Sequence, residues 1–162
     1  LGLVAIYPYA KRFTWWPQLF LGLAFNWGVI VAYTAHRGAP DLPAVILYGA
    51  GIAWTLFYDT IYAHQDKDDD ILIGVKSTAL KFGENTRTWL AGFFALTTLL
   101  LALAAWGVSA GPVTYAGIAA AALQQVVGAI AVDGVAARAA RRILDDRANG
   151  KPVHAVREVC CI

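Results

Sequence analysis

The longest uncharged segment limits what this chain can fold into. Thr88 to Val132 is a run of 45 residues without Asp, Glu, Lys or Arg. About 20 apolar residues already cross the hydrocarbon core of a bilayer as a helix, so this run is long enough for two crossings. The composition agrees, since 59% of residues are hydrophobic and only 15% are charged. Together these features indicate a membrane protein and exclude a disordered chain, a disulfide scaffold and a coiled coil.

Glycine and proline divide the apolar sequence into four predicted spans. Gly111 and Pro112 break the long run, and Gly38 and Pro40 separate two earlier apolar segments. We therefore expect an all-α, multi-pass transmembrane helical bundle that forms one partial domain over 1–162. The predicted spans lie near 13–35, 42–63, 88–107 and 113–132, with a loop at 64–87 and a C-terminal tail at 133–162.

Basic residues are concentrated on one side of these spans. Of the 13 Lys and Arg residues, two precede the first span, four lie in 59–87 and six lie in the tail, whereas Arg37 alone lies in the joint between the first two spans. Lys and Arg are retained on the cytoplasmic side of membrane proteins. The N-terminus, the 64–87 loop and the tail are therefore expected to face the cytoplasm.

An acidic run follows the second predicted span. If that helix continued to Asp70, its 100° step would place Asp59, Tyr62, Asp66 and Asp70 within one narrow fan. Carboxylates this close to a membrane need a cation, and oxygen ligands with open coordination positions suit Mg²⁺ bound to phosphate. We expect Asp66 and Asp70 to share such an ion. The alternative is ordinary solvated loop charge.

Other metal sites fit the acidic run poorly. An EF-hand that began at Asp66 would have Ile71 where the turn glycine belongs and Ser77 where the bidentate Glu belongs. A zinc site would have only His64 and the remote Cys160 and Cys161, and we expect His64 to be a surface residue.

Basic residues that could bind phosphate lie on the same predicted side. They are Lys11 and Arg12 before the first span, Lys67 within the acidic run and Lys76 after it, whereas Lys81 is interpreted as a plain surface charge. The segment 71–83 is apolar enough to form a short amphipathic helix that covers the site as a lid and excludes water.

Two strings carry a resemblance to a known family. YPYAKRFTWWPQLFLGLAFNWG at 7–28 and YDTIYAHQDKDDDILIGVKSTALKFG at 58–83 resemble the UbiA superfamily of intramembrane aromatic prenyltransferases. They are most similar to the branch that prenylates 4-hydroxybenzoate. The family's second acidic motif, DxxxD, matches Asp66 to Asp70. The resemblance implies a larger UbiA-type bundle in a bacterial or mitochondrial inner membrane.

The resemblance also implies a reaction and roles for individual residues. The reaction is Mg²⁺-dependent transfer of a polyprenyl group from polyprenyl diphosphate to the ring of 4-hydroxybenzoate in ubiquinone biosynthesis. The expected partners are these two substrates and the lipid bilayer, with no nucleic acid. The implied roles are metal binding by Asp66 and Asp70, support of the metal site by Asp59, and diphosphate binding by Lys11, Arg12 and Lys76. The aromatic face of Tyr62 or Trp54 is expected to stabilise the prenyl cation through its quadrupole.

The sequence departs from the family pattern at both ends. The family's first motif, NDxxDxxxD, belongs upstream of YPYAKR, and PVHAVREVCCI replaces the usual last membrane helix. We therefore expect an interior piece of a larger protein that is inactive alone. The alternative function is a non-catalytic membrane module for cation binding or transport, although transport usually places ionisable residues at mid-membrane depth.

Overall fold

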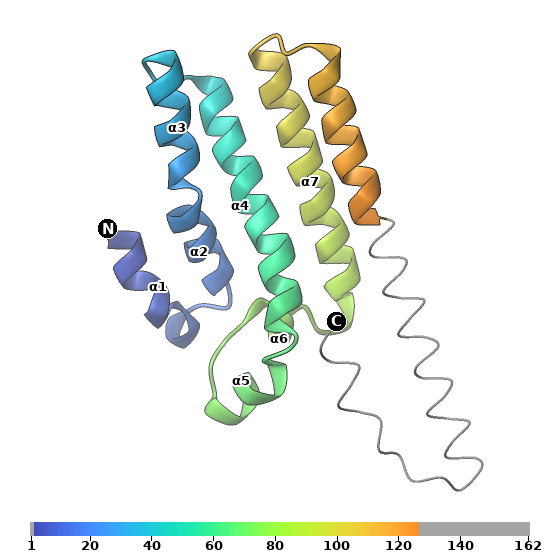
Figure 1. Ribbon diagram of the computed structural model, residues 1–162. Helices are drawn as coiled ribbons and strands as arrows, with labels where there is room; N and C mark the ends of the chain where they lie inside the picture. The colour runs from blue at the N-terminus through green and yellow to red at the C-terminus, as the bar shows by residue number, and fades with distance from the viewer. Residues whose placement is uncertain (1, 127–162) are drawn as a thin grey trace, which may run out of the picture. The chain divides into compact units, whose positions relative to one another are not determined.

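The structure, a computed structural model, describes residues 2–126, and the secondary structure of these residues consists of helices joined by turns and short loops (Figure 1). In chain order the helices are α1 (Gly2–Phe13), α2 (Pro17–Phe25), α3 (Trp27–Arg37), α4 (Leu42–Ala63), α5 (Lys67–Ile73), α6 (Thr78–Phe82), the 3-10 turn η1 (Gly83–Asn85) and α7 (Thr86–Gly107). Residues 112–126 are also helical. The predicted all-α, multi-pass helical class is confirmed, while the end of the fourth predicted span and the tail 133–162 lie outside the described residues.

Three helical stretches are long and apolar enough to cross a membrane. They are Pro17–Arg37, Leu42–Ala63 and Thr78–Gly107. The first begins at Pro17 rather than near Phe13 because proline is favoured at the first helical position, where its missing N–H costs nothing. The second, α4, has the bounds that the sequence predicted for the second span.

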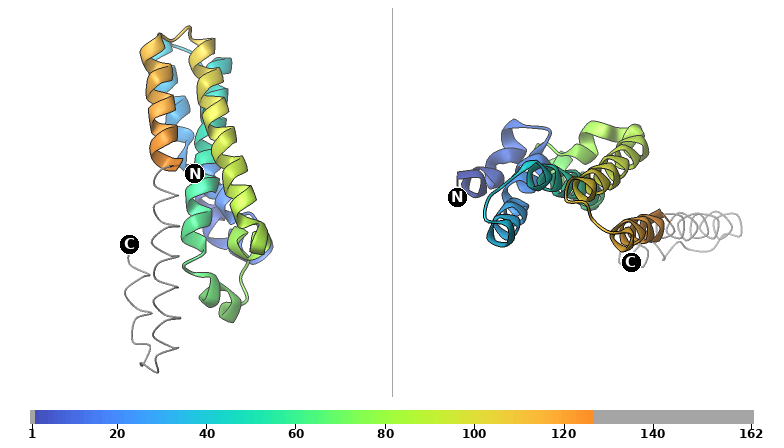
Figure 2. Two further views of the ribbon diagram at one scale, coloured as in Figure 1. Left: turned by 90° about the vertical axis from the view of Figure 1, so that its right-hand side faces the viewer. Right: turned by 90° about the horizontal axis from the view of Figure 1, so that it is seen from above.

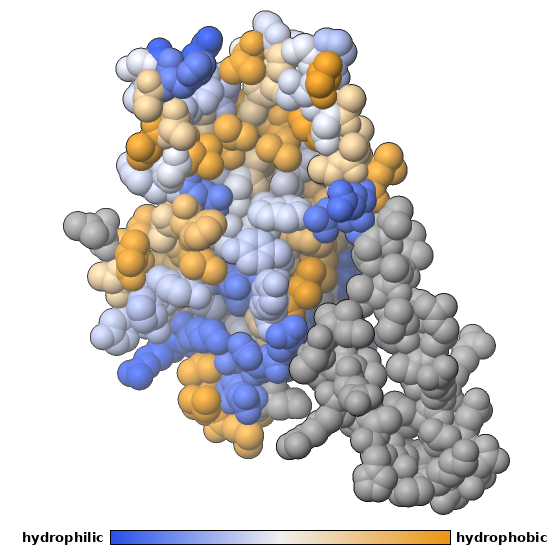
Figure 3. Space-filling view, in the orientation of Figure 1, coloured by the Kyte–Doolittle hydropathy of each residue, from blue (hydrophilic) through white to orange (hydrophobic). Residues whose placement is uncertain are grey.

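Helix α4 is the centre of the bundle. It packs against α7 along most of its length and against α2 and α3 on another side (Figures 1 and 2). Its buried residues are mostly small, including Ala50, Ala53 and Thr55, which lets neighbouring helix backbones approach closely. Apolar side chains are spread over the surface of the long helices, and a band of hydrophilic side chains crosses the end of the bundle that carries α5 (Figure 3).

Asn26 interrupts the first apolar stretch, a break that the sequence did not predict. Its side-chain nitrogen donates to the carbonyl oxygen of Gly22 (2.8 Å) and to the hydroxyl of Thr55 (2.9 Å). Thr55 in turn donates to the carbonyl oxygen of Gly51 (2.9 Å), and a Cβ at Gly51 would overlap Asn26 Oδ1. The break between α2 and α3 is therefore held by a polar contact to α4, satisfied within the apolar stretch as the membrane requires.

Candidate active site

The acidic run does not continue the second span as one helix. Helix α4 ends at Ala63, residues 64–66 turn, and α5 begins after its N-cap Asp66. The negative end of the α4 dipole would repel a run of carboxylates, whereas the first turn of a new helix favours them. The predicted fan on a single continuous helix is therefore wrong. Asp66 and Asp70 nevertheless lie one helical turn apart, because the Asp70 N–H donates to the Asp66 carbonyl oxygen (2.8 Å).

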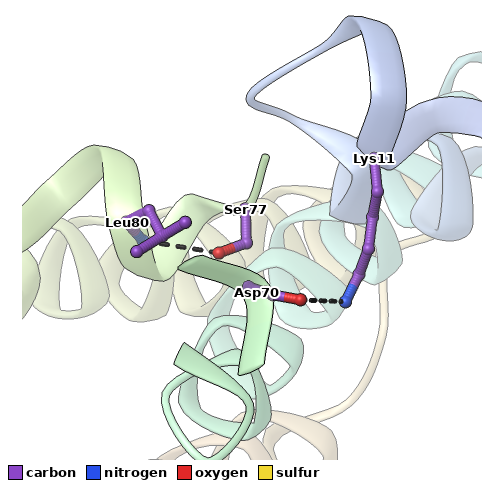
Figure 4. Close-up of polar contacts among 4 residues, drawn as sticks. All are labelled: Lys11, Asp70, Ser77 and Leu80. Atoms are coloured by element: carbon purple, nitrogen blue, oxygen red, sulfur yellow. Dashed lines mark hydrogen bonds and ion pairs between the residues drawn. The ribbon is translucent and has the colours of Figure 1, made fainter. Parts of the chain in front are cut away.

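The end of α1 supplies a cation to the acidic helix. Lys11 Nζ lies 3.1 Å from Asp70 Oδ1, although 59 residues separate the two in sequence (Figure 4). Asp70 is only 4% exposed, and its other oxygen, Oδ2, is buried without a hydrogen-bond partner. Gly74 ends α5 in the left-handed conformation, so that Gly74 and Val75 both donate to the Asp70 carbonyl oxygen (3.0 Å each). The buried carboxylate thus has one charged partner and one free acceptor oxygen.

The segment that follows α5 is hydrogen-bonded to the end of α1. The Lys76 N–H donates to the Lys11 carbonyl oxygen (2.8 Å), and Lys76 Nζ donates to the Phe13 carbonyl oxygen (3.4 Å). The same ammonium lies 5.6 Å from the centre of the Trp15 ring. Lys76 therefore satisfies free carbonyl groups at the C-terminal end of α1 and brings its charge to the same end of the bundle as Lys11.

The second half of the loop is fixed to the bundle. The hydroxyls of Thr60 and Thr78 form a fully buried hydrogen bond (2.8 Å), and Ser77 caps α6 by accepting from the Leu80 N–H (3.4 Å; Figure 4). Phe82 stacks on Trp89 with the ring centres 4.7 Å apart. The predicted single lid helix over 71–83 is therefore wrong: the segment forms two short helices joined by 74–77, because Gly74 ends α5 and α6 is packed against α4 and α7.

Two half-buried residues lie near Lys11: Asp59, and Tyr7, which the sequence analysis did not single out. Asp59, half-buried near the end of α4, is close enough to Lys11 and Asp66 to interact electrostatically. Burial raises the pKa of Tyr7, the negative charge of Asp59 raises it further, and Lys11 opposes both. Tyr7 precedes Lys11 by four residues in the string YPYAKR, which is one helical turn. This i, i+4 spacing could have identified Tyr7 from the sequence as a neighbour of Lys11.

The other predicted residues are more exposed. Arg12 is exposed, with its guanidinium 6.0 Å from the ring centre of Tyr9, and Asp66 is exposed at the start of α5. Tyr62 is 58% exposed and meets Tyr58 edge to face. The structure thus brings Lys11, Asp70 and Lys76 into one hydrogen-bonded group. Within residues 2–126, no side-chain hydrogen bond or ion pair joins Arg12 or Tyr62 to that group.

His64 is part of the packing and not a free surface residue. It is half-buried, and its Nε2 lies 3.2 Å from the Thr86 hydroxyl at the start of α7. Burial lowers the pKa of His64, and the positive charge of Lys67 lowers it further. The imidazole therefore ties the end of α4 to α7 in its neutral form.

Carboxylates at this end could take part in binding a divalent cation. Among residues 2–126 no group of three or more His, Cys, Asp or Glu side chains is placed to hold a metal ion. Mg²⁺, however, is commonly held by one or two carboxylates and completes its shell with water and substrate phosphates. The free, buried Oδ2 of Asp70, with Asp66 one turn away, fits such a partial site.

The family model and the relatives that match this chain all indicate the same family. The model described as "UbiA prenyltransferase family" matches residues 1–147. The chain is 58% identical over 107 residues to the mitochondrial 4-hydroxybenzoate polyprenyltransferase of Drosophila melanogaster, covering 65% of this chain and 27% of that protein. It is 57% identical over 113 residues to the Homo sapiens protein of the same name, covering 68% and 30%.

A plant relative shows the same partial overlap. The chain is 53% identical over 123 residues to the mitochondrial 4-hydroxybenzoate polyprenyltransferase of Arabidopsis thaliana, covering 75% of this chain and 30% of that protein. The chain therefore spans less than a third of the length of these relatives. No solved structure matches the chain significantly.

Proposed function

Because this chain belongs to the UbiA prenyltransferase family, we propose that it carries part of the site that transfers a polyprenyl group from polyprenyl diphosphate to the ring of 4-hydroxybenzoate in ubiquinone biosynthesis. The observation that supports this most directly is the contact between Lys11 and the buried Asp70. It joins the two sequence strings of the family at one end of the bundle, where cations and carboxylates meet beside a membrane.

Each charged residue at this end has a proposed role. Asp66 and Asp70 would hold Mg²⁺, and Asp59 would add negative charge behind them. Lys11, Arg12 and Lys76 would contact the diphosphate, since Arg binds phosphate oxygens through paired N–H groups and Lys acts as a point charge. The backbone bonds between Lys76 and Lys11 support this arrangement by holding both cations at one place.

The first step of the proposed reaction is the heterolytic cleavage of a carbon–oxygen bond. The bond between the first prenyl carbon and the diphosphate breaks, and the electron pair leaves with the diphosphate. Bound Mg²⁺ would neutralise part of the charge of that leaving group. Lys11, Arg12 and Lys76 would stabilise the same developing charge.

The allylic carbocation that remains after the diphosphate has left must be stabilised and then attacked by a nucleophile. The face of Tyr62 would stabilise the allylic cation through its quadrupole, as aromatic rings do for other cations. The ring carbon ortho to the phenol of 4-hydroxybenzoate attacks the cation, and the ring then loses the proton from that carbon.

A binding experiment tests the site in this chain. The purified 162-residue chain in lipid nanodiscs should bind inorganic pyrophosphate in a Mg²⁺-dependent way, measured by isothermal titration calorimetry. Asp66→Asn and Asp70→Asn should each remove most of that binding. Asp41→Asn is the matched control, because Asp41 caps α4 at the other end of the helix and Asn also caps well. Unchanged binding by both site variants would contradict the proposed metal role.

A transfer experiment tests the reaction. The matching segment of the Homo sapiens relative would be replaced by this chain's segment, and prenylation of 4-hydroxybenzoate would be followed in membranes with Mg²⁺ and polyprenyl diphosphate. An active graft that loses activity with Asp66→Asn or Asp70→Asn supports the proposal. Full activity of both variants in an active graft would overturn it.

The charge distribution supports an orientation for this site. The end of the bundle that holds Lys11 and Asp70 would face the cytoplasm or the mitochondrial matrix, by the positive-inside bias. With Cys160 and Cys161 replaced by Ser, a single Cys at Glu84 should be protected from an impermeant maleimide in sealed, right-side-out vesicles, and one at Ala39 should react. The opposite labelling pattern would reverse the topology.

A further inference from the structure

A pocket lies at the opposite end of the bundle from the Lys11 and Asp70 contact. It has a volume of about 260 Å³ and is lined by Tyr33, His36, Arg37 and Val108. Helix α3 ends at Arg37 and α7 ends at Gly107, and both ends lie far from α5 (Figure 1). The adjoining helices are in close contact, since a Cβ at Gly107 would come within 2.8 Å of Pro43 Cγ. The pocket thus lies on a packed part of the bundle.

The polar side chains that line this pocket can all donate hydrogen bonds. The Tyr33 hydroxyl oxygen is buried, and no described residue lies in good hydrogen-bond geometry to it. The Arg37 guanidinium and the Asp41 carboxylate are both close to this hydroxyl. Within residues 2–126, Arg37 forms no ion pair. An Arg guanidinium offers five N–H groups in a planar fork that suits phosphate oxygens, and Tyr and His can add further donors.

The nearby carboxylate is already engaged. Asp41 caps α4, and its side chain accepts from the Ala44 N–H (3.3 Å). The positive N-terminal end of α4 therefore compensates part of the Asp41 charge. Arg37 remains available to an outside anion.

The position of the pocket indicates which anion. Arg37 is the last residue of the apolar stretch Pro17–Arg37, which places it at headgroup depth. It is also the exception to the charge bias, because the other basic residues lie on the opposite predicted side. Val108 adds an apolar wall that is 38% exposed. A donor-lined pocket with an apolar wall, at this depth, matches a headgroup phosphate attached to glycerol and acyl chains.

We propose that this pocket binds the phosphate of an anionic phospholipid in the leaflet opposite the acidic loop. Arg37 grips the phosphate oxygens, the Tyr33 hydroxyl donates to one of them, and Val108 contacts the start of an acyl chain. The proposal concerns a separate end of the molecule and does not depend on the prenyl-transfer reaction.

Native mass spectrometry of the purified chain with added phosphatidylglycerol tests the proposal. Wild type should retain one phosphatidylglycerol more firmly than phosphatidylcholine. Arg37→Gln should weaken that retention about tenfold, as expected for loss of charged hydrogen bonds, and Tyr33→Phe should weaken it less. Lys81→Gln is the matched control, because it removes one positive charge at the other end of the bundle and should leave this lipid in place.

A thermal-shift series separates a binding role from a folding role. Without lipid, Arg37→Gln should melt at the wild-type temperature; with phosphatidylglycerol, only wild type and Lys81→Gln should be stabilised through this pocket. Two results would overturn the proposal. One is that phosphatidylglycerol raises the melting temperature of Arg37→Gln as much as that of wild type. The other is that Arg37→Gln melts at a lower temperature without lipid and still retains the lipid as firmly as wild type. Stabilisation by inorganic phosphate with no further effect of phosphatidylglycerol would show that the ligand is free phosphate and would also overturn the assignment to a lipid.

Discussion

Lys11 and Asp70 form an ion pair of 3.1 Å that joins the C-terminal end of α1 to α5. The two partners differ in exposure, since the Lys11 side chain is 37% exposed and the Asp70 side chain only 5%. Removal of either charge should therefore have unequal effects. The acid is the partner that cannot be solvated if its cation is lost.

The first prediction concerns this asymmetry. Lys11→Met should lower the free energy of unfolding by about 2 kcal/mol, because it leaves a buried carboxylate without a cation; the partial exposure of Lys11 reduces the cost below that of a fully buried pair. Asp70→Asn should cost less, because Lys11 can then be hydrated. Thermal or denaturant unfolding in detergent micelles measures both.

Arg12→Gln is the control for these variants, since Arg12 is the exposed neighbour of Lys11 and should change stability little. The double variant Lys11→Met with Asp70→Asn should be more stable than the sum of the single effects implies. Additive effects would show that the two side chains do not interact in the folded protein.

The second prediction concerns the break at Asn26. Gly51→Ala should destabilise the chain by about 1–3 kcal/mol, because the new methyl group would overlap the Asn26 amide. Gly49→Ala is the matched control in the same helix, where the nearest atom to the added Cβ is Leu100 Cδ1 at an ordinary 3.6 Å. In an Asn26→Ala background the cost of Gly51→Ala should largely disappear. A cost that persists there would place its cause elsewhere.

The third prediction concerns the attachment of α6. Thr78→Val removes one hydroxyl of the buried Thr60 and Thr78 pair and leaves the other without its partner, which should cost about 1–3 kcal/mol. Limited proteolysis should then cleave the 64–87 loop faster. Thr98→Val is the control, because the Thr98 hydroxyl bonds within its own helix to the Phe94 carbonyl oxygen. Equal protease sensitivity of wild type and Thr78→Val would mean that this bond does not hold α6.

The fourth prediction concerns pH. The pKa of His64 is lower in the folded protein than the ordinary 6.5, so the unfolded chain binds more protons as pH falls through this range. The stability that comes from neutral His64 is present above about pH 6.5 and is lost as pH falls towards its folded pKa. The melting temperature of wild type should therefore fall more than that of His64→Gln upon acidification without divalent cations. Parallel pH curves would show that His64 remains uncoupled from folding.

Much of the architecture followed from the sequence because membrane spans are set by length and hydropathy. The bounds of α4 were predictable because Asp41 and two prolines mark its start and polar residues follow its end. The break at Asn26 was not predictable, because it depends on a hydroxyl of another helix, Thr55, at hydrogen-bond distance. Local patterns carry no information on such a partner.

The sequence by itself determined that this chain forms apolar helices with acidic and basic residues concentrated at one end. Hydropathy and charge are local properties, and the bilayer converts them directly into helix positions. Only the tertiary structure decided which charges meet. It divides the acidic run into the end of α4 and the start of α5, buries Asp70 against Lys11 and leaves Arg12 outside, because helix dipoles and the packing of α1 on the 74–77 segment depend on contacts between residues far apart in the chain.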